Sequence, residues 1–122
     1  MENLRLMTLA LAVILATGCA VPKKVDKEWV ATGGSRADAT VELSYEYDPN
    51  REMPQTNDQQ ALELAKVRCR SWGYRSAEPF GGVKNVCNNM AYAGLAGMVC
   101  LSRFVTKQYQ CLGRGSEAST NR

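Results

Sequence analysis

Histidine is absent from the 122-residue sequence. Because histidine is the usual general base near neutral pH and the commonest metal ligand, its absence excludes histidine-dependent catalytic triads and histidine-containing zinc sites. A large excess of one charge is also missing, since 15 basic residues stand against 12 acidic ones. So weak a balance gives no support for nucleic-acid binding, and we expect no nucleic-acid partner.

The N-terminal apolar run is too short to cross a bilayer. It covers eleven positions, residues 6–16, and is interrupted only by Thr8, whereas a membrane-spanning helix needs about 20 residues. The run follows a short polar start that carries Arg5, which is the arrangement of a signal peptide. We therefore expect residues 1–18 to be a lipoprotein signal peptide that is cleaved.

Cys19 follows small residues, as the acylated cysteine does in the lipobox of bacterial lipoproteins. Ala16, Thr17 and Gly18 precede it, although leucine is commonest at the position that Ala16 occupies. The chemistry needs a cysteine, because its thiolate takes the diacylglycerol group. Several acyl chains, palmitate among them, make such anchoring firm. We expect lipidated Cys19 to hold the protein on a membrane; the alternative is ordinary secretory cleavage after Ala20, which would discard the cysteine.

The residue after the cysteine indicates the destination of a lipoprotein. Ala20 is not the aspartate associated with retention in the inner membrane. The resemblance to lipoproteins therefore implies the bacterial outer membrane, with the protein facing the periplasm. Pro22 and Gly33-Gly34 follow, among charges of both signs. This composition predicts a lipid anchor and flexible tether over residues 19–39.

The folded part is predicted to begin with a strand and a helix. Residues 40–47 alternate apolar and polar side chains, which is typical of a half-buried strand. Thr56 and Gln59 have the spacing of a capping box, so a helix is expected to start there. Its apolar stripe includes Cys69, and Gly73 is expected to end it.

Two further strands complete the predicted domain. They are expected at residues 74–80 and 99–112. The predicted fold is α+β: one helix packed on a three-stranded antiparallel sheet, in the order β-α-β-β, over residues 40–113. Residues 114–122 are polar and are expected to form a disordered tail.

Four cysteines remain once Cys19 is assigned to the lipid. Cys69 lies on the buried stripe of the helix and Cys111 on the core face of the last strand, so we favour that pair, with Cys87 joined to Cys100. Four cysteines allow three connectivities, and the others stay open. A four-thiolate zinc site is disfavoured because the gaps between these cysteines are 17, 12 and 10 residues, against two to four within each half of a zinc site. We expect no metal and no cofactor.

Several motifs of the sequence together resemble the YecR-like family of small bacterial lipoproteins. The most specific are Cys69-x-x-Trp72-Gly73-Tyr74 and Tyr109-Gln110-Cys111. The resemblance implies an envelope lipoprotein and implies no particular activity. The full set of motifs covers residues 33–38, 40–47, 68–74, 77–82 and 105–111.

A non-catalytic binding or structural domain is the favoured function. Residues 90–98 form an apolar stretch punctuated by glycine, and such patches mark contacts when they are exposed. Tyr92, Leu95 and Met98 are therefore candidate residues for binding an envelope protein or glycan. The alternative is that this stretch folds back to complete a small core.

An enzyme acting on envelope glycans is the rival function. Glu42, Glu46 and Glu78 would have to supply the acid–base chemistry. Glu42 and Glu46 alternate with the apolar residues of the first predicted strand, so they are expected to point away from the core as an ordinary wet face. The sequence also lacks a Cys-x-x-Cys redox motif. We expect the protein not to be an enzyme.

Overall fold

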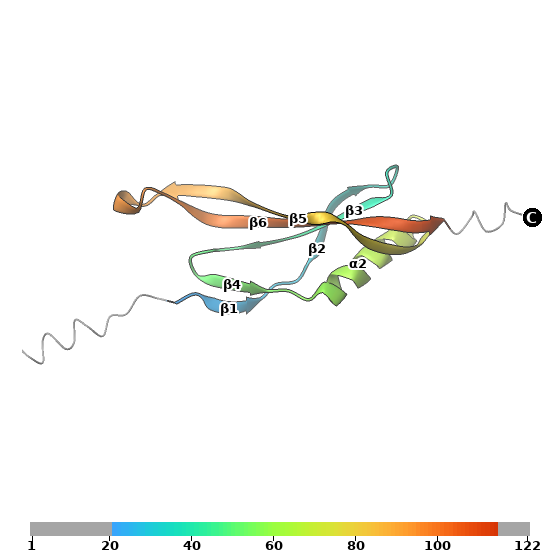
Figure 1. Ribbon diagram of the computed structural model, residues 1–122, viewed down its shortest axis with the longest axis horizontal. Helices are drawn as coiled ribbons and strands as arrows, with labels where there is room; N and C mark the ends of the chain where they lie inside the picture. The colour runs from blue at the N-terminus through green and yellow to red at the C-terminus, as the bar shows by residue number, and fades with distance from the viewer. Residues whose placement is uncertain (1–20, 115–122) are drawn as a thin grey trace, which may run out of the picture.

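The structure is a computed structural model that describes residues 21–114. Strands make up most of this part of the chain (Figure 1). These residues form two sheets and one α-helix. In chain order the elements are β1 (Lys23–Asp26), β2 (Val30–Ser35), β3 (Thr40–Tyr47), β4 (Glu52–Gln55), α2 (Asp58–Ser71), β5 (Tyr74–Tyr92), the 3-10 turn η1 (Gly94–Ala96) and β6 (Met98–Arg114).

The predicted α+β fold with a three-stranded sheet is wrong. The main sheet has four antiparallel strands in the order β2-β3-β6-β5, and a second sheet pairs β1 with β4 in parallel. The described part of the chain is therefore mostly β, with one helix against the main sheet. The prediction missed β1, β2 and β4. Strand β1 pairs with β4, which lies far along the chain, and β2, although it pairs with its neighbour β3, contains Gly33-Gly34 and has no alternating hydrophobic pattern.

The segment predicted as a flexible tether is folded. Residues 23–35 contribute two strands, and Trp29 between them is buried in the core. The side-chain amide of Gln60, on α2, accepts from the Trp29 backbone N–H and donates to its carbonyl oxygen, both at 3.0 Å. The Trp29 ring also meets Tyr45 edge to face, with ring centroids 4.7 Å apart. The predicted domain start at residue 40 is therefore too late.

The predicted strand at residues 40–47 is confirmed as β3. It pairs with β6 in one continuous antiparallel register, from Thr40 opposite Gln110 to Tyr47 opposite Arg103. Val41 and Leu43 point at the helix side and are fully buried. Strict alternation was enough to predict this strand, since each apolar residue faces the same side of the pleat.

Helix α2 packs its small residues against the sheet. Ala61, Ala65 and Cys69 are fully buried, as the predicted stripe requires. The helix begins at Asp58, and its N-cap is Asn57 rather than Thr56: the Asn57 side chain accepts the first free N–H groups of the helix. The predicted helix is therefore present, but its N-terminus is capped by Asn57 and not by a capping box at Thr56.

A disulfide ties this helix to the centre of the main sheet. Cys69 is bonded to Cys111 on β6, with a Cα–Cα distance of 5.4 Å, and both residues are buried. This is the pair that the sequence favours. The bond joins the two layers of the core, which in so small a domain has little apolar volume of its own.

The long hairpin of β5 and β6 extends past the rest of the main sheet (Figure 1). The strands predicted at residues 74–80 and 99–112 are parts of these longer ones, and Arg114, predicted to begin the tail, still belongs to β6. Pairing with β3 stops at Arg103, whereas β5 and β6 stay paired to Tyr92 opposite Met98. We call residues 85–102 the arm. Residues 115–122, predicted as tail, lie outside the described part.

Candidate functional site

The arm carries no charged residue. Lys84 and Arg103 flank it at the base, and residues 85–102 between them are all uncharged. Pairing along the arm is irregular, with register shifts on both sides of Asn89. Such bulges bend a strand pair and increase its twist. The result is an uncharged two-stranded extension of an otherwise charged domain.

A glycine-dependent turn closes the arm. Gly94 and Gly97 have φ angles of 57° and 71°, a backbone conformation that favours glycine. The Ala93 N–H donates to the Gly97 carbonyl oxygen at 2.8 Å and closes the loop. Between the glycines, Leu95 is fully exposed at the end of the arm.

Apolar side chains cluster around this turn and are exposed. Tyr92 is 76% exposed, Met98 59% and Met90 54%. Tyr92 lies directly opposite Met98 in the hairpin, so the two side chains share one face. We call Met90, Tyr92, Leu95 and Met98 the tip. None of the buried hydrophobic residues of the described chain lies in the arm, so this stretch does not fold back to complete the core.

A second disulfide links the two strands of the arm. Cys87 on β5 is bonded to Cys100 on β6, with a Cα–Cα distance of 5.9 Å. These cysteines are the other pair that the sequence favours. Because a two-stranded ribbon is only marginally stable in water, this covalent link limits the fraying of the arm below the tip.

Polar contacts fix the base of the arm to β3. The Glu46 carboxylate accepts from the Ser102 hydroxyl and from the Asn88 side-chain amide, the latter at 3.2 Å. The hydrogen bond from Ser102 is the main reason that the pKa of Glu46 lies below its usual value. Because Asn88 lies on β5 and Ser102 on β6, the Glu46 carboxylate holds both strands of the arm.

The turn between β3 and β4 supports the arm from a second side. Asn50 in this turn donates from its side-chain nitrogen to the Cys100 carbonyl oxygen at 2.7 Å. The neighbouring Arg51 carbonyl accepts from the backbone N–H of Lys23 at 2.9 Å. The arm, the β3–β4 turn and the start of β1 are thus connected through consecutive contacts.

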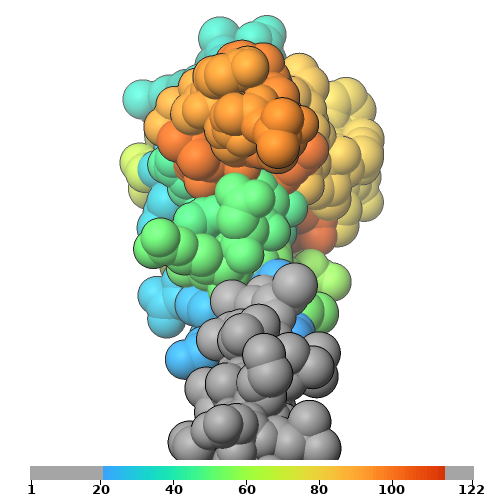
Figure 2. Space-filling view, turned by 90° about the vertical axis from the view of Figure 1, so that its left-hand side faces the viewer, coloured from blue at the N-terminus to red at the C-terminus, as the bar shows by residue number. Residues whose placement is uncertain are grey.

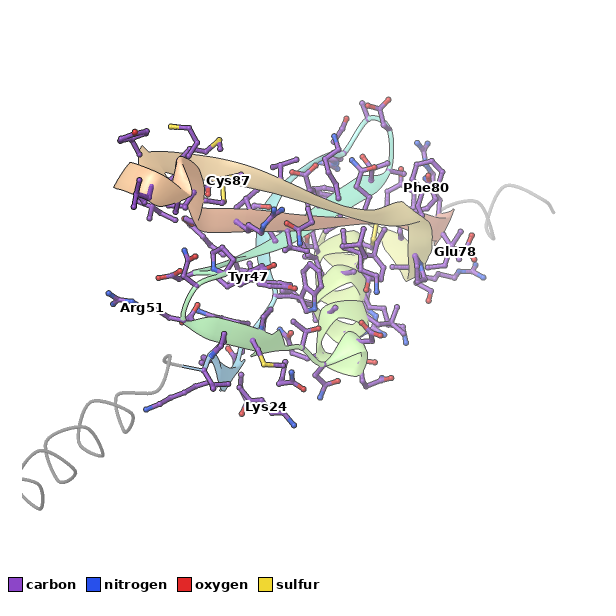
Figure 3. All side chains as sticks on the ribbon, turned by 60° about the vertical axis from the view of Figure 1, so that its left-hand side comes forward. Lys24, Tyr47, Arg51, Glu78, Phe80 and Cys87 are labelled. Atoms are coloured by element: carbon purple, nitrogen blue, oxygen red, sulfur yellow. A yellow bond between two sulfur atoms is a disulfide. The ribbon has the colours of Figure 1, made fainter. Side chains whose placement is uncertain are left out.

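The predicted carboxylates are not brought together. Glu42 and Glu46 lie four residues apart on one strand, which is roughly 13 Å, whereas paired glycosidase carboxylates lie about 5–9.5 Å apart. Glu42 accepts from Gln108 at 3.3 Å and borders a shallow hollow of about 210 Å³. Glu78 lies on β5 at the opposite end of the molecule from Cys87 (Figure 3).

Cys19, the predicted lipidation site, lies outside the described residues. The described chain begins at Val21, two positions further on. Within residues 21–114 no helix is long and apolar enough to cross a membrane. The same residues contain no cluster of acidic and cysteine side chains able to hold a metal ion.

Sequence reasoning named Tyr92, Leu95 and Met98 as candidates but not Met90, and it missed what supports the tip. The Gln60 contacts to Trp29, and those of Glu46 to the arm, join residues far apart in the sequence and leave no local pattern. One signal was available: an uncharged stretch as long as 85–102, bounded by Lys84 and Arg103, is unusual in a chain with 22% charged residues.

These features define a small, mostly β domain with two disulfides over residues 21–114. The sequence profile of the YecR-like lipoprotein family matches residues 28–112. The chain belongs to this family, as its motifs indicated, and is accordingly a bacterial envelope lipoprotein associated with a membrane. The match runs from Glu28, the residue before Trp29, through Leu112 and includes the whole arm. A comparison with curated proteins finds no match.

Proposed function

We propose that this lipoprotein is anchored in the outer membrane by lipid on Cys19, faces the periplasm, and acts as a non-catalytic binding module whose arm contacts another component of the envelope. The observation that carries the binding role is the exposed apolar tip on an uncharged arm. Contiguous apolar patches on small soluble domains commonly mark contact sites.

The support of the arm favours binding. Its strands are linked by the Cys87–Cys100 disulfide, and its base is held by Glu46 and Asn50. Each side chain that must be immobilised on association costs about 0.5–1.5 kcal/mol. A surface whose backbone is already ordered avoids much of the further cost of loop ordering.

The size of the tip implies a weak contact that depends on the anchor. Its four side chains would each contribute about 1.5–3 kcal/mol if fully buried. That gross gain of roughly 6–12 kcal/mol is comparable with the 4–15 kcal/mol that free association costs. Tethering to the same membrane as the bound component raises the effective concentration and removes much of this cost.

The anchor itself is supported by the leader and by the family. Ala16-Thr17-Gly18-Cys19 has the form of a lipobox, and the YecR-like family consists of lipoproteins. Ala20 after the cysteine favours the outer membrane. A Cys19→Ala variant is expected to lose lipidation and to leave the membrane fraction. If it stayed in that fraction with its mass unchanged, the lipid anchor would be wrong.

Site-specific photocrosslinking in intact envelopes tests the binding role. A photoreactive residue at Leu95 is compared with one at Val67, which is also exposed but lies on α2. We expect a discrete adduct from Leu95 and none from Val67, identified by mass spectrometry as peptide or lipid. Equal or absent crosslinking at both positions would contradict a contact role for the tip.

A further inference from the structure

The tip and the beginning of the described chain lie at the same end of the molecule. Figure 1 shows the hairpin turn and the start of β1 at one end, with the last strand residues at the other. Seen from that end, the β3–β4 turn lies between the tip and the start of β1 (Figure 2). The bond from Asn50 to Cys100 and the bond from Lys23 to Arg51 fix this arrangement.

Only a short length of chain separates this end from the anchor. Cys19 precedes Val21 by two residues, which span at most about 7 Å when fully extended. Leu95 precedes Cys100 by five residues and lies on the turn side of it, so the tip projects up to about 16 Å past the level of the disulfide. A bilayer that holds acylated Cys19 therefore lies at the end of the molecule that carries the tip (Figure 1).

The chemistry of the tip suits the interface of a bilayer. Tyr92 combines an apolar ring with a polar hydroxyl, which favours the headgroup level of a membrane. Leu95 and the two methionines would enter the acyl boundary without carrying any charge with them, because residues 85–102 have none. Neutrality matters here, since burying a single unpaired charge would offset the gain from these side chains.

Basic residues lie at the same end of the molecule as the tip, on the β3–β4 turn and on β1. Arg51 has a side chain that is 86% exposed, and Lys24 is exposed on β1; both lie towards the end that carries Cys87 (Figure 3). Such residues favour the anionic headgroups of a membrane surface. Asp48 lies 3.8 Å from the guanidinium of Arg51, whose side chain remains largely exposed, and Glu46 is hydrogen-bonded to the arm.

We infer that the tip inserts into the interface of the same membrane that holds the lipid on Cys19, so that the arm is a second membrane contact. This inference rests on the proposed function and names the bilayer as the component that the arm contacts. The domain would then lie against the membrane in one orientation, with its β3–β4 turn between the two contacts and helix α2 away from the lipid.

Fluorescence of an introduced tryptophan tests this inference in the lipidated protein. Leu95→Trp and the matched control Val67→Trp are each reconstituted in vesicles of phosphatidylethanolamine and phosphatidylglycerol. The emission of the parent protein, which contains Trp29 and Trp72, is subtracted. Lipids brominated along their acyl chains serve as quenchers of tryptophan that lies about 5–10 Å below the headgroup boundary.

We expect the Leu95→Trp emission to shift to shorter wavelength and to lose at least half of its intensity in brominated vesicles, while Val67→Trp keeps the spectrum of an exposed indole. An unquenched, water-like spectrum at position 95 would overturn the inference. If Leu95 then still crosslinked to a protein in intact envelopes, the arm would be a protein contact and the proposed function would stand. If it crosslinked to nothing, both would fall.

Discussion

Replacing Gly34 by alanine tests why strand β2 needs a glycine beside β3. Gly34 has a φ angle of +130°, a conformation that residues with a side chain rarely adopt. A β-carbon at this position would overlap the Thr40 carbonyl oxygen and lie 3.0 Å from the Val41 α-carbon. Both of these atoms belong to the backbone, so neither can rotate away.

The expected cost follows from these two effects. A strained backbone costs about 1–3 kcal/mol, and forcing a methyl group into a filled site costs about 1–3 kcal/mol more. We therefore expect Gly34→Ala to lower the free energy of unfolding by about 2–6 kcal/mol. Small domains have about 5–15 kcal/mol in total. For a domain of this size the melting temperature would fall by on the order of 10–30 °C.

The adjacent glycine provides a matched control. A β-carbon on Gly33 would meet only side-chain atoms of Glu42, at 3.5–3.8 Å, which is ordinary contact. Gly33→Ala should change stability by less than about 1 kcal/mol, because alanine also restricts the unfolded chain. Thermal unfolding followed by circular dichroism, with the disulfides intact, compares the two. Melting temperatures within a few degrees of each other would refute the steric reasoning.

Three further changes have expected outcomes. Removing the Cys69–Cys111 bond by replacing both residues with alanine should lower the free energy of unfolding by about 4 kcal/mol, because the bond closes a loop with a sequence separation of 42; urea unfolding measures this. Asn57→Ala should cost about 1 kcal/mol in the same assay, while Thr56→Ala should be nearly neutral, and the reverse order would restore the capping box. Because the pKa of Glu46 is lowered by folding, its contribution is present above the unfolded pKa of about 4.3 and is lost as the pH falls through the folded value. Glu46→Gln should therefore flatten the stability profile below about pH 4, and an unchanged profile would contradict the hydrogen bonds to that carboxylate.

Local pattern was sufficient where one face of an element is buried and the other is wet. Strand β3 and the buried position of Cys69 on α2 followed from side-chain spacing alone, because burial there repeats with the period of the element. The helix start differed by a small shift, since Asn57 and Thr56 are both plausible caps and only the backbone geometry decides between them.

The rest of the fold depends on strand pairing that the residues of one strand alone do not reveal. Residues 23–35 look like a linker, yet Lys23 pairs with Glu52 and Val30 with Ser44. In the same way, Gly81-Gly82 looks like a turn between two strands, but β5 absorbs the glycines in a register shift between Phe80 and Lys84 and continues. Pairing with a neighbouring strand therefore outweighed the preference of these residues for turns or linkers.

Three residues of the tip were candidates from sequence, whereas the exposure and support of the tip could not be predicted. An apolar, uncharged stretch is visible in a single sequence, and so Tyr92, Leu95 and Met98 were candidates. Whether that stretch is exposed depends on where β3 ends, because the hairpin beyond Arg103 has no third strand to cover it. The acidic residue that holds the arm's base lies 42 and 56 positions away from its two donors.

The parallel pairing of β1 with β4 has a mechanical consequence. If the protein is held at Cys19, as proposed, tension passes into the core through β1, the first strand of the described chain. The bonds from Lys23 to Arg51 and from Lys27 to Gln55 lie across the direction of that strand, at 2.9 Å each. A pull along β1 therefore loads these hydrogen bonds together in shear rather than opening them one after another. The short sheet then bears the tension before the core does.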